Sequence, residues 1–355
     1  MNLNQLPALR ALSGPVLVTG HSGFKGTWLI LLLEKLGIEV VGFSLSPEKD
    51  SLFDRAGRMG AIKEVFADIR DYERLNSCVD SVKPSAIIHM AAQPLVLESY
   101  RLPKDTFDVN VMGTINVLDS AFRTDSVKAV VVVTTDKVYR NDNSGRAFIE
   151  SDPLEGKDPY SASKVGTEAA VAAWQQIQSI SGGPKVVAVR AGNVIGGGDW
   201  GDNRLLPDLI RSFSSGQKMA VRNPSSTRPW QHVLDPLSGY VSALEAILGG
   251  EKISSVNFGP DTQSIAVSEV VKIAVETWGP GSNIELDNSV AKNTTEAVSL
   301  DLNPSYAKQI LKWEPRWGQE EAVVSTVQWW NKVINQGVSP VDACLDDLNR
   351  ILTQK

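Results

Sequence analysis

The stretch that most constrains this 355-residue chain runs from position 16 to position 26 and reads VLVTGHSGFKG. Four residues of strand character lead directly into glycines at positions 20, 23 and 26, and a helical pattern, TWLILLLEKLG, follows. Glycines in such a turn permit a tight bend, a close approach of the backbone to a ligand, and close packing of helix on strand. Because the helix N-terminus also offers free N–H groups to phosphates, the stretch predicts the first strand–turn–helix unit of a dinucleotide-binding fold.

The first half of the chain goes on to alternate short apolar runs with helical patterns. Strand-like runs stand at residues 38–47, 64–71, 86–93, 129–135 and 185–190. Between them, residues 72–82 and 110–122 have the apolar spacing of helices. This alternation predicts an α/β fold with a doubly wound parallel sheet, on which ligands bind beyond the carboxyl ends of the strands.

Small or polar residues stand where these strands end. Asp68 ends the third strand, Ala91 and Ala92 close the fourth, and Thr135 closes the fifth. Together with the glycine turn, they predict a single ligand-binding edge. The second strand ends near Ser44 without a carboxylate, so this signal does not decide between NAD and NADP.

Composition narrows the class of protein. The formal net charge is −6, without the basic footprint that nucleic-acid binding usually leaves. No apolar run is long enough to span a membrane, and the N-terminus lacks the pattern of a signal peptide. Two cysteines and three widely separated histidines indicate neither a disulfide framework nor a metal site. We therefore expect a cytoplasmic protein with a small-molecule ligand and no nucleic-acid, membrane or metal partner.

The segment Tyr160-Ser-Ala-Ser-Lys164 carries the chemistry of a hydride-transfer enzyme. On a helix, residues four apart lie on the same face, and an ammonium beside a phenol lowers the pKa of the phenol. Such a tyrosine can take the proton of a sugar hydroxyl while hydride leaves the same carbon for a nicotinamide. A surface Tyr and Lys would give the same pattern, but the glycine turn and Thr135 favour the catalytic interpretation.

Eight runs of residues follow one another in order over about residues 15–245: TGHSGFKGTWL, HMAAQPLV, NVMGT, TTDKVY, DPYSASK, RAGNVIGGGDW, RLLPDLIRS and RNPSSTRPWQHVLDPLSGY. In these runs, and in the G-x-x-G-x-x-G spacing of the turn, the chain resembles the extended short-chain dehydrogenase/reductases. Within that superfamily it resembles the CDP-glucose 4,6-dehydratases. The resemblance implies a Rossmann-like domain that binds NAD, a smaller mixed α/β substrate-binding lobe, and CDP-glucose as the substrate.

The same resemblance implies a division of the chain. Residues 1–190, with a return segment at about 230–260, would form the NAD-binding domain. Residues 191–229 and 261–337 would form the substrate-binding lobe, and residues 338–355 a C-terminal helix. In this superfamily the helices that begin near Asn110 and Tyr160 pair across a two-fold axis, which implies a homodimer, or a tetramer built from it. Ala169, Val171 and Ala172 are among the apolar residues that permit this pairing.

Thr135-Asp136-Lys137 implies the type of reaction. Once carbon 4 of the sugar is a ketone, a 4,6-dehydratase must remove the proton at carbon 5 and protonate the leaving hydroxyl at carbon 6. By resemblance, Asp136 is the acid and Lys137 the base, and hydride then returns from NADH to carbon 6. For these roles the pKa of Lys137 must fall by several units, and Asp136 must hold a proton near neutral pH.

The remaining site residues are also assigned by resemblance. The cofactor-binding residues are Gly20, Gly23, Phe24, Lys25, Gly26, Asp68, Ile69, Ala91, Ala92, Gln93, Tyr160 and Lys164. The substrate-binding residues are Asn193, Arg204, Leu206, Arg222, Arg228, Trp230 and His232. The spacing of Arg222 and Arg228 suits a clamp on a diphosphate, and His21 in the turn is a further candidate for a phosphate or sugar contact.

Two alternatives remain at this point. A nucleotide-sugar epimerase would keep Tyr160 and Lys164 without needing Asp136 and Lys137, and a 4,6-dehydratase could act on another nucleotide-sugar. A non-catalytic NAD-binding protein would have lost the Tyr or the Lys, and both are present. Leu97 and Glu98 stand where the family commonly has arginines before the Ser-Tyr pair, which weakens the prediction of the base and the sugar.

Overall fold

The structure, a computed structural model, describes residues 5–142, 144–282, 284–287 and 300–353. Its centre is a seven-stranded sheet in the order β12-β7-β5-β4-β1-β2-β3, with every neighbouring pair parallel. The strands are β1 (Val16–Thr19), β2 (Val40–Ser44), β3 (Lys63–Phe66), β4 (Ala86–His89), β5 (Ala129–Val133), β7 (Lys185–Ala191) and β12 (Ser255–Phe258). The predicted doubly wound parallel sheet is confirmed.

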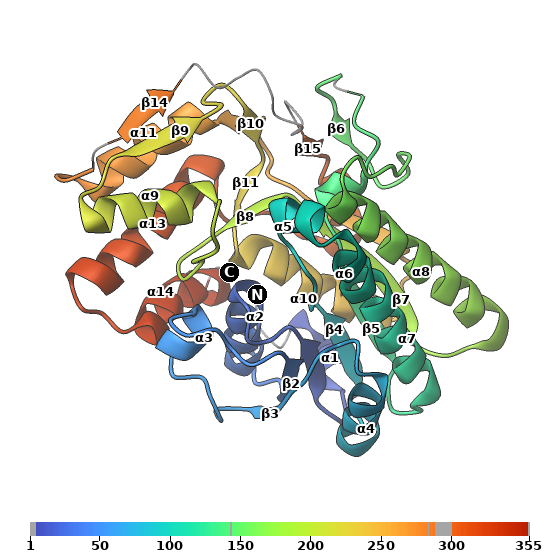
Figure 1. The fold of residues 1–355 in the computed structure, drawn as a ribbon. Coiled ribbons are helices and arrows are strands. Elements are labelled where there is room, and N and C mark those ends of the chain that lie inside the picture. The colour runs from blue at the N-terminus through green and yellow to red at the C-terminus, as the bar shows by residue number, and fades with distance from the viewer. Residues whose placement is uncertain (1–4, 143, 283, 288–299, 354–355) are drawn as a thin grey trace.

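Helices cover both faces of this sheet (Figure 1). One layer holds α2 (Phe24–Lys35) and α10 (Leu234–Leu248), and the other holds α4 (Tyr72–Val82), α7 (Gly113–Arg123) and α8 (Pro159–Ser181). Alternate strand residues serve the two layers, since Val16 and Val18 join the core under α2 while Leu17 joins the core under α4 and α7. All residues of β1 are buried, as expected for a strand covered on both faces.

Two helix starts differ from the sequence-based expectation. Helix α2 begins at Phe24, with Gly23 as its N-cap, so Gly26 lies inside the first turn and not before it. The helix expected from Asn110 begins earlier, as α6 (Pro103–Phe107), and passes through a π-helical turn, η2 (Asp108–Met112), into α7. Local apolar spacing could not reveal this start, because the wider turn shifts the helical register.

A second group of elements gathers on the left of Figure 1, with β14 and α11 at its top and α14 at its bottom. It comprises α9 (Leu205–Ser215), β9 (Met219–Arg222), α11 (Val267–Trp278), β14 (Ile284–Asp287), α13 (Gln319–Asn335) and α14 (Pro340–Thr353). The stretch RAGNVIGGGDW continues the end of β7 and contains β8 (Asn193–Ile195), which pairs in parallel with β11 (Trp230–His232). Short elements complete the chain: α1 (Pro7–Arg10), α3 (Leu52–Arg55), α5 (Val96–Arg101), η3 (Asp136–Val138), β6 (Ala147–Phe148), β10 (Thr227–Arg228), β13 (Ile265–Ala266), β15 (Asp301–Leu302) and α12 (Ser305–Leu311).

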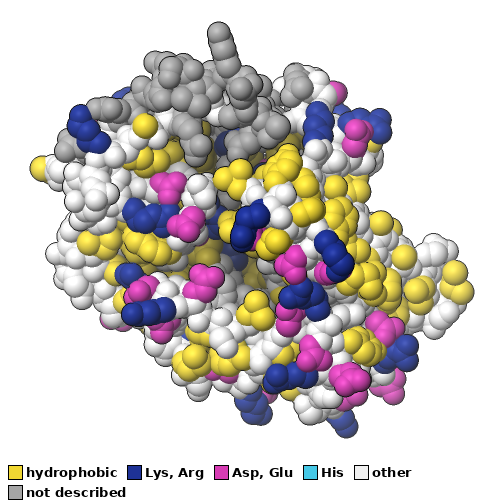
Figure 2. Space-filling view, viewed as in Figure 1, with side chains coloured by type: hydrophobic (Ala, Val, Ile, Leu, Met, Phe, Trp, Pro, Cys, Tyr) yellow, Lys and Arg dark blue, Asp and Glu magenta, His cyan; other side chains and the backbone are white. Residues whose placement is uncertain are grey.

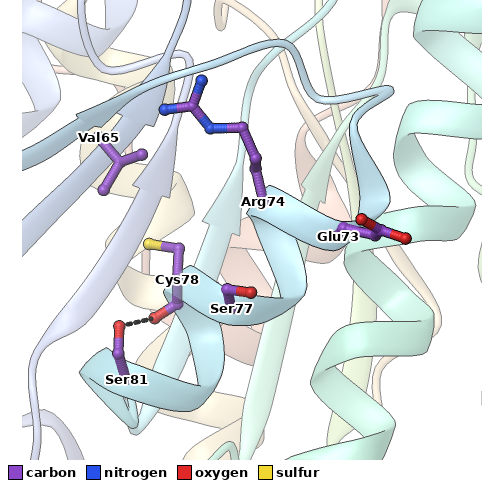
Figure 3. Close-up of a pocket in the computed structure, with 6 residues that line it drawn as sticks. All are labelled: Val65, Glu73, Arg74, Ser77, Cys78 and Ser81. Atoms are coloured by element: carbon purple, nitrogen blue, oxygen red, sulfur yellow. Dashed lines mark hydrogen bonds between the residues drawn. The ribbon is translucent and has the colours of Figure 1, made fainter.

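Among the described residues, no helix is long and apolar enough to cross a membrane. A shallow hollow of about 430 Å³ lies beside the outer strand β3 and α4 (Figure 3). Its walls are Val65, Glu73, Arg74, Ser77, Cys78 and Ser81, none of which belongs to the predicted site.

Candidate active site

The strand order sets the layout of the predicted site. Because β7, β5, β4 and β1 are consecutive in the sheet, the segments that follow their carboxyl ends lie side by side. These segments contain Asn193 after β7, Thr135 after β5, Ala91 after β4 and Gly20 after β1. Asp68 follows β3, which is separated from β1 by β2. The sheet therefore brings residues from five places in the chain to one edge.

The glycine turn needs its glycines for measurable reasons. Gly20 has φ +74°, and a Cβ there would lie 2.8 Å from the backbone nitrogen of Ala91. A Cβ on Gly26 would lie 2.1 Å from the carbonyl oxygen of Gly20. Gly23 caps α2 without a side-chain hydrogen bond, so the first turn of the helix keeps N–H groups that can meet an anion. The glycines therefore let the turn pack closely on Ala91 and on α2, and the start of α2 has the donors that a pyrophosphate requires.

The other cofactor candidates lie along the same edge. Gln93 is held by Asn110, whose side chain bonds both the N–H and the carbonyl of Gln93 at 2.8 and 3.1 Å. Asp68 accepts hydrogen bonds from Arg70, which hold the pKa of Asp68 below its usual value. Ile69 is buried against Gly113. Asp68 is thus an ionised acceptor at the far end of the site.

Helix α8 presents Tyr160 and Lys164 because its start is strongly specified. Asp158 and Ser161 form a capping box, and Pro159 occupies the first turn. The backbone N–H of Tyr160 donates to Ser99 Oγ of α5 at 3.1 Å. Lys164 Nζ donates to the carbonyl of Val133, the last residue of β5, at 3.2 Å.

Asp136 and Lys137 form a tight pair in η3, directly after β5. Lys137 Nζ lies 3.1 Å from Asp136 Oδ1, and Thr135 Oγ1 donates to the same oxygen at 2.9 Å. Asp136 Oδ2 is buried and has no hydrogen-bond partner among the described residues. Asn193 Oδ1 lies 3.5 Å from Lys137 Nζ. One carboxylate oxygen is therefore fully engaged while the other is left without a partner.

The pKa shifts differ from two expectations. Burial lowers the pKa of Lys137, but the charge of Asp136, negative charge on Tyr160 and the hydrogen bond to Asp136 outweigh it, so the pKa is raised and not lowered. Burial also raises the pKa of Tyr160, and Lys137, a hydrogen bond with Thr135 and Arg204 oppose this rise. The ammonium of Lys164 is turned toward the carbonyl of Val133. Burial lowers the pKa of Lys164 itself to about 8.

The side chain of Lys25 reaches the same centre, which the sequence did not suggest. Its Nζ lies 3.0 Å from the hydroxyl of Tyr240, a fully buried residue of α10. Burial, together with the charges of Lys164 and Arg204, lowers the pKa of Lys25 to about 7. Tyr240 and Asn110 are the neighbours that sequence reasoning missed. The motif runs containing them were noted, but nothing in the runs singled these residues out.

The predicted substrate residues divide into two groups. Arg204 and Arg228 lie near the centre, since Arg204 acts on the pKa of Tyr160 and Arg228 on that of Lys137. Arg204 is anchored by Asp199 at 2.9 and 3.0 Å. The backbone of Arg222 ends β9, and its side chain lies outside the described part of the structure. The side chain of Leu206 is buried in the core, so a substrate could meet only its backbone.

Trp230 and His232 lie in the interior. Trp230 is 6% exposed and His232 is fully buried, with its ring stacked on Trp317 at a centroid distance of 4.2 Å. His232 Nε2 lies 3.4 Å from a carboxylate oxygen of Asp347 in α14. The structure therefore does not bring the His232 side chain to a cleft, because β11 is packed beneath α13 and α14.

The side chain of His21 also lies in the core. It is fully buried between Phe53 and Phe66, and its Nε2 lies 3.1 Å from Glu64. Burial lowers the pKa of His21. The first position after Gly20 points under the turn toward β2, where a Cβ on Gly42 would meet the imidazole ring at 2.5 Å.

On the face shown in Figure 2, Lys and Arg side chains lie near the middle of the molecule, beside a group of hydrophobic side chains over α5 and α6. The exposed apolar residues of that segment include Leu97, Tyr100, Leu102 and Phe107. Glu98, which stands among them, pairs with Arg101 on the surface. In the described part of the chain, no group of three or more His, Cys, Asp or Glu residues is placed to hold a metal ion.

The fold and the layout of this edge define a class of nucleotide-binding enzyme, and comparison with known proteins agrees. The chain belongs to the NAD dependent epimerase/dehydratase family, whose profile matches residues 16–259. It is 41% identical over 323 residues to the CDP-glucose 4,6-dehydratase of Salmonella typhimurium, covering 88% of this chain and 89% of that one. It is 26% identical to a UDP-glucose 4-epimerase of Halalkalibacterium halodurans, over 91% of this chain and 97% of that one.

Solved structures share the fold. A dTDP-glucose 4,6-dehydratase from Streptomyces venezuelae, determined with NAD bound, superimposes with a TM-score of 0.76 at 23% identity. The superposition covers 92% of this chain and 99% of that one.

Proposed function

We propose that the protein is a hydro-lyase that converts CDP-glucose to CDP-4-keto-6-deoxyglucose and water with bound NAD. The observation that carries this proposal is the Asp136–Lys137 pair beside Tyr160. An epimerase needs only the tyrosine, the lysine and the cofactor, whereas elimination also needs an acid and a base. The similarity to the Salmonella enzyme over nearly the whole chain supports CDP-glucose as the substrate.

The residues of the glycine turn fit NAD. Gly20 and Gly26 let the turn pack closely on Ala91 and α2, the start of α2 keeps free N–H groups for a pyrophosphate, and Asp68 offers an ionised acceptor to the adenine end. Segment 91–93 lies against the turn on one side and is held by Asn110 on the other. Bound NAD would accept hydride from carbon 4 of the sugar and return it to carbon 6.

In the first step, Tyr160 takes the proton of the 4-hydroxyl. Burial raises the pKa of Tyr160, so its reactive form depends on the cations near it, Lys137 and Arg204. The ammonium of Lys164 is held at the end of β5 by its hydrogen bond to the carbonyl of Val133.

Elimination requires a proton to move within the Asp136–Lys137 pair. In the ion pair, Lys137 carries the proton that the acid needs, and Asp136 lacks it. Transfer across the 3.1 Å hydrogen bond makes a neutral amine and a neutral carboxylic acid without changing the net charge. The charge that raises the pKa of Lys137 then disappears, while burial and Arg228 still lower it.

The neutral pair performs both tasks of the elimination. Lys137 Nζ removes the proton at carbon 5, and Asp136 gives its proton to the leaving 6-hydroxyl, which departs as water. The ion pair is thereby restored. Lys137 next returns a proton to carbon 5 as hydride reaches carbon 6, and the proton that Tyr160 took from the 4-hydroxyl replaces it.

We also propose the division of labour along the chain. Residues 1–190 and the return segment 230–260 would bind NAD, and residues 191–229 and 261–337 would bind the nucleotide-sugar. The predicted C-terminal helix is α14 (Pro340–Thr353) in the described part of the chain. Asn193, Arg204 and Arg228 are the best placed of the predicted substrate residues, since each lies close to Lys137 or Tyr160.

The test is to incubate the purified protein with CDP-, UDP- and dTDP-glucose in deuterated water and follow the products by mass and NMR. Loss of one water with deuterium at carbon 5 supports the dehydratase. A 4-epimer without exchange would show an epimerase instead. Reaction with only UDP- or dTDP-glucose would overturn the substrate and keep the chemistry.

A homodimer is the assembly we propose. Phe107 and Met112 on α6 and η2, and Ile177 and Ile180 on α8, are exposed apolar side chains on the helices expected to pair. Val171 cannot contribute, because it is buried in the monomer core. Light scattering on the wild type and on Met112→Glu with Ile180→Glu checks this, with dissociation of the double variant as the expected result.

A further inference from the structure

A buried histidine outside the proposed chemistry joins two threonines under the glycine turn. His89, the last residue of β4, is 2% exposed. Its Nδ1 lies 2.7 Å from Thr19 Oγ1, and its Nε2 lies 3.0 Å from Thr114 Oγ1. Thr19 ends β1 and Thr114 belongs to α7, so the imidazole connects the first strand to a helix on the far side of β4.

The surrounding acceptors determine where each proton lies. Thr114 Oγ1 donates its only hydrogen to the carbonyl of Asn110 at 2.6 Å, so it must accept from His89 Nε2–H. Thr19 Oγ1 accepts the N–H groups of Met90 and Ala91 at 3.1 and 3.2 Å, so its own hydrogen goes to a bare Nδ1. The opposite tautomer would leave the buried Thr19 hydrogen without an acceptor. A doubly protonated ring would do the same, which agrees with burial and the charge of Lys164 lowering the pKa of His89 to about 3.

The chain of hydrogen bonds holds both ends of segment Met90–Gln93. Thr19 fixes the amides of Met90 and Ala91, and the Asn110 side chain fixes Gln93 at its N–H and its carbonyl. His89 connects Thr19 to Asn110, because it bonds Thr19 directly and reaches Asn110 through Thr114. We call this chain of hydrogen bonds, from Thr19 through His89 and Thr114 to Asn110, the relay. The Gly20 turn lies so close to Ala91 that even a Cβ would not fit between them.

The same chain reaches the helix that carries Tyr160 and Lys164. The Asn110 amide also donates to Ser163 Oγ at 2.9 Å, and Thr167 Oγ1 donates to the Asn110 carbonyl at 2.8 Å. Ser163 and Thr167 flank Lys164 on α8. A movement of His89 would therefore displace both the segment Met90–Gln93 and helix α8, which carries Tyr160 and Lys164.

We propose that His89 is a positioning residue that, as the neutral Nε2–H tautomer, keeps segment Met90–Gln93 in register with the catalytic helix. The proposal rests on the proposed function, because that function puts NAD against this segment. His89 touches no reacting atom. It acts through Thr19, Thr114 and Asn110 on the alignment of the cofactor with the sugar carbon.

The first test replaces the ring. His89→Phe removes both hydrogen bonds, His89→Asn keeps an acceptor near Nδ1, and His89→Gln keeps a donor near Nε2. We expect kcat for His89→Phe to fall about 10²-fold, as for a small misplacement of reacting groups, with KM for CDP-glucose changed by less than about twofold. The two amide variants should each lose less. The limbs of the pH–rate profile should stay in place, because a neutral ring contributes no ionisation in the working range.

A second variant guards against misfolding. Thr114→Val keeps the shape of the side chain but removes its hydrogen bonds to His89 and to the carbonyl of Asn110. The effects of His89→Phe and Thr114→Val on kcat should be clearly non-additive if both act through one chain. Additive effects would contradict the relay. Leu75→Ala, in the same core layer but outside the relay, is the control for general destabilisation and should leave kcat of the folded protein unchanged.

Two readouts do not depend on turnover. Nitrogen NMR of the ring should show Nε2 protonated and Nδ1 bare, and the reverse tautomer would overturn the assignment. Amide hydrogen exchange at Ala91 and Gln93 in the cofactor-free protein should accelerate in His89→Phe and not in Leu75→Ala. If wild-type protein fails to turn over CDP-glucose but these readouts hold, the proposed function fails and the relay stands. Unchanged exchange in His89→Phe would refute the relay whatever the substrate.

Discussion

Two clusters of charged residues lie near the carboxyl end of β5, and they differ in how their charges are paired. The rear cluster is centred on Arg190 and Glu168, and the front cluster on Asp136 and Lys137. In the rear cluster, Arg190 makes a bidentate pair with Glu168, both hydrogen bonds being 2.8 Å, and also donates to the Tyr139 hydroxyl at 2.7 Å. The Thr134 hydroxyl donates a hydrogen bond to Glu168 at 2.6 Å, and the Tyr139 hydroxyl donates one to the side-chain oxygen of Asn257 at 2.7 Å. Every charge in it has a counter-charge and every hydroxyl a partner.

The front cluster is unbalanced by comparison. The front cluster holds the lysines at positions 25, 137 and 164 and one carboxylate, Asp136. Lys137 pairs with Asp136, whose charge also acts on Lys25, and Asp136 Oδ2 has no hydrogen-bond partner among the described residues. Burial lowers the pKa of Lys25 to about 7 and that of Lys164 to about 8, while the pKa of Lys137 is raised by its carboxylate neighbour. Buried charges whose hydrogen bonds are all made hold structure in place, whereas groups with shifted pKa values and an open hydrogen-bonding position are available to move protons. The comparison therefore assigns the rear cluster a structural role and the front cluster a chemical one.

The largest effect is expected from Asp136→Asn in the front cluster. Dehydration should fall by about 10²- to 10⁴-fold, because the variant lacks the acid for the leaving hydroxyl. The midpoint of thermal unfolding should fall only slightly, because the side chain of Lys137, which loses its counter-charge, is 36% exposed and can be solvated. Product formation from CDP-glucose and a thermal melt measure the two quantities. A variant with wild-type turnover would remove Asp136 from the mechanism.

The rear cluster should respond in the opposite way. Glu168→Gln leaves the buried Arg190 without its counter-charge and should lower the free energy of unfolding by about 3–5 kcal/mol. Chemical denaturation measures this loss. If Glu168→Gln were as stable as the wild type, the contrast between the clusters would collapse.

Lys25→Met should stabilise the protein at neutral pH, because the folded state disfavours the charged amine. The folded pKa of about 7 lies below the ordinary value of 10.5, so the unfolded chain binds the extra proton between those pH values. Stability of the wild type should therefore rise with pH across this window, and the advantage of the variant should shrink toward its upper end. Thermal melts at several pH values test the slope, and a constant difference would contradict it.

The smallest effect is expected at the surface, from Glu155→Gln. Glu155 pairs with Arg140, and the two side chains are 50% and 61% exposed. Solvent and salt screen such a pair, so the free energy of unfolding should change by about 1 kcal/mol or less. This variant makes the same chemical change as Glu168→Gln and is its matched control. A loss as large as that of Glu168→Gln would mean that the charge change itself, and not burial, sets the effect.

Much of the fold and of the site could be predicted from the sequence, because the relevant signals are local. The strand at 16–19, the glycine turn and the helix at 72–82 agree with β1, its turn and α4, since strand runs, turn glycines and apolar spacing act over a few residues. The candidates at the strand ends also come to one edge of a single parallel sheet. The spacing of Tyr160 and Lys164 required only a helix, and α8 supplies it.

Tertiary structure decided what those residues experience. Lys25 meets Tyr240, and His232 stacks on Trp317, through contacts between segments far apart in the chain. The pKa of Lys137 is raised because Asp136 outweighs burial, a balance of opposing effects that spacing cannot evaluate. Side-chain burial and charge environment depend on the packing of distant elements, whereas turns and periodicity depend on neighbours in sequence. The sequence therefore determined which groups are present at the edge of the sheet, and the folded chain determined which of them are free to react.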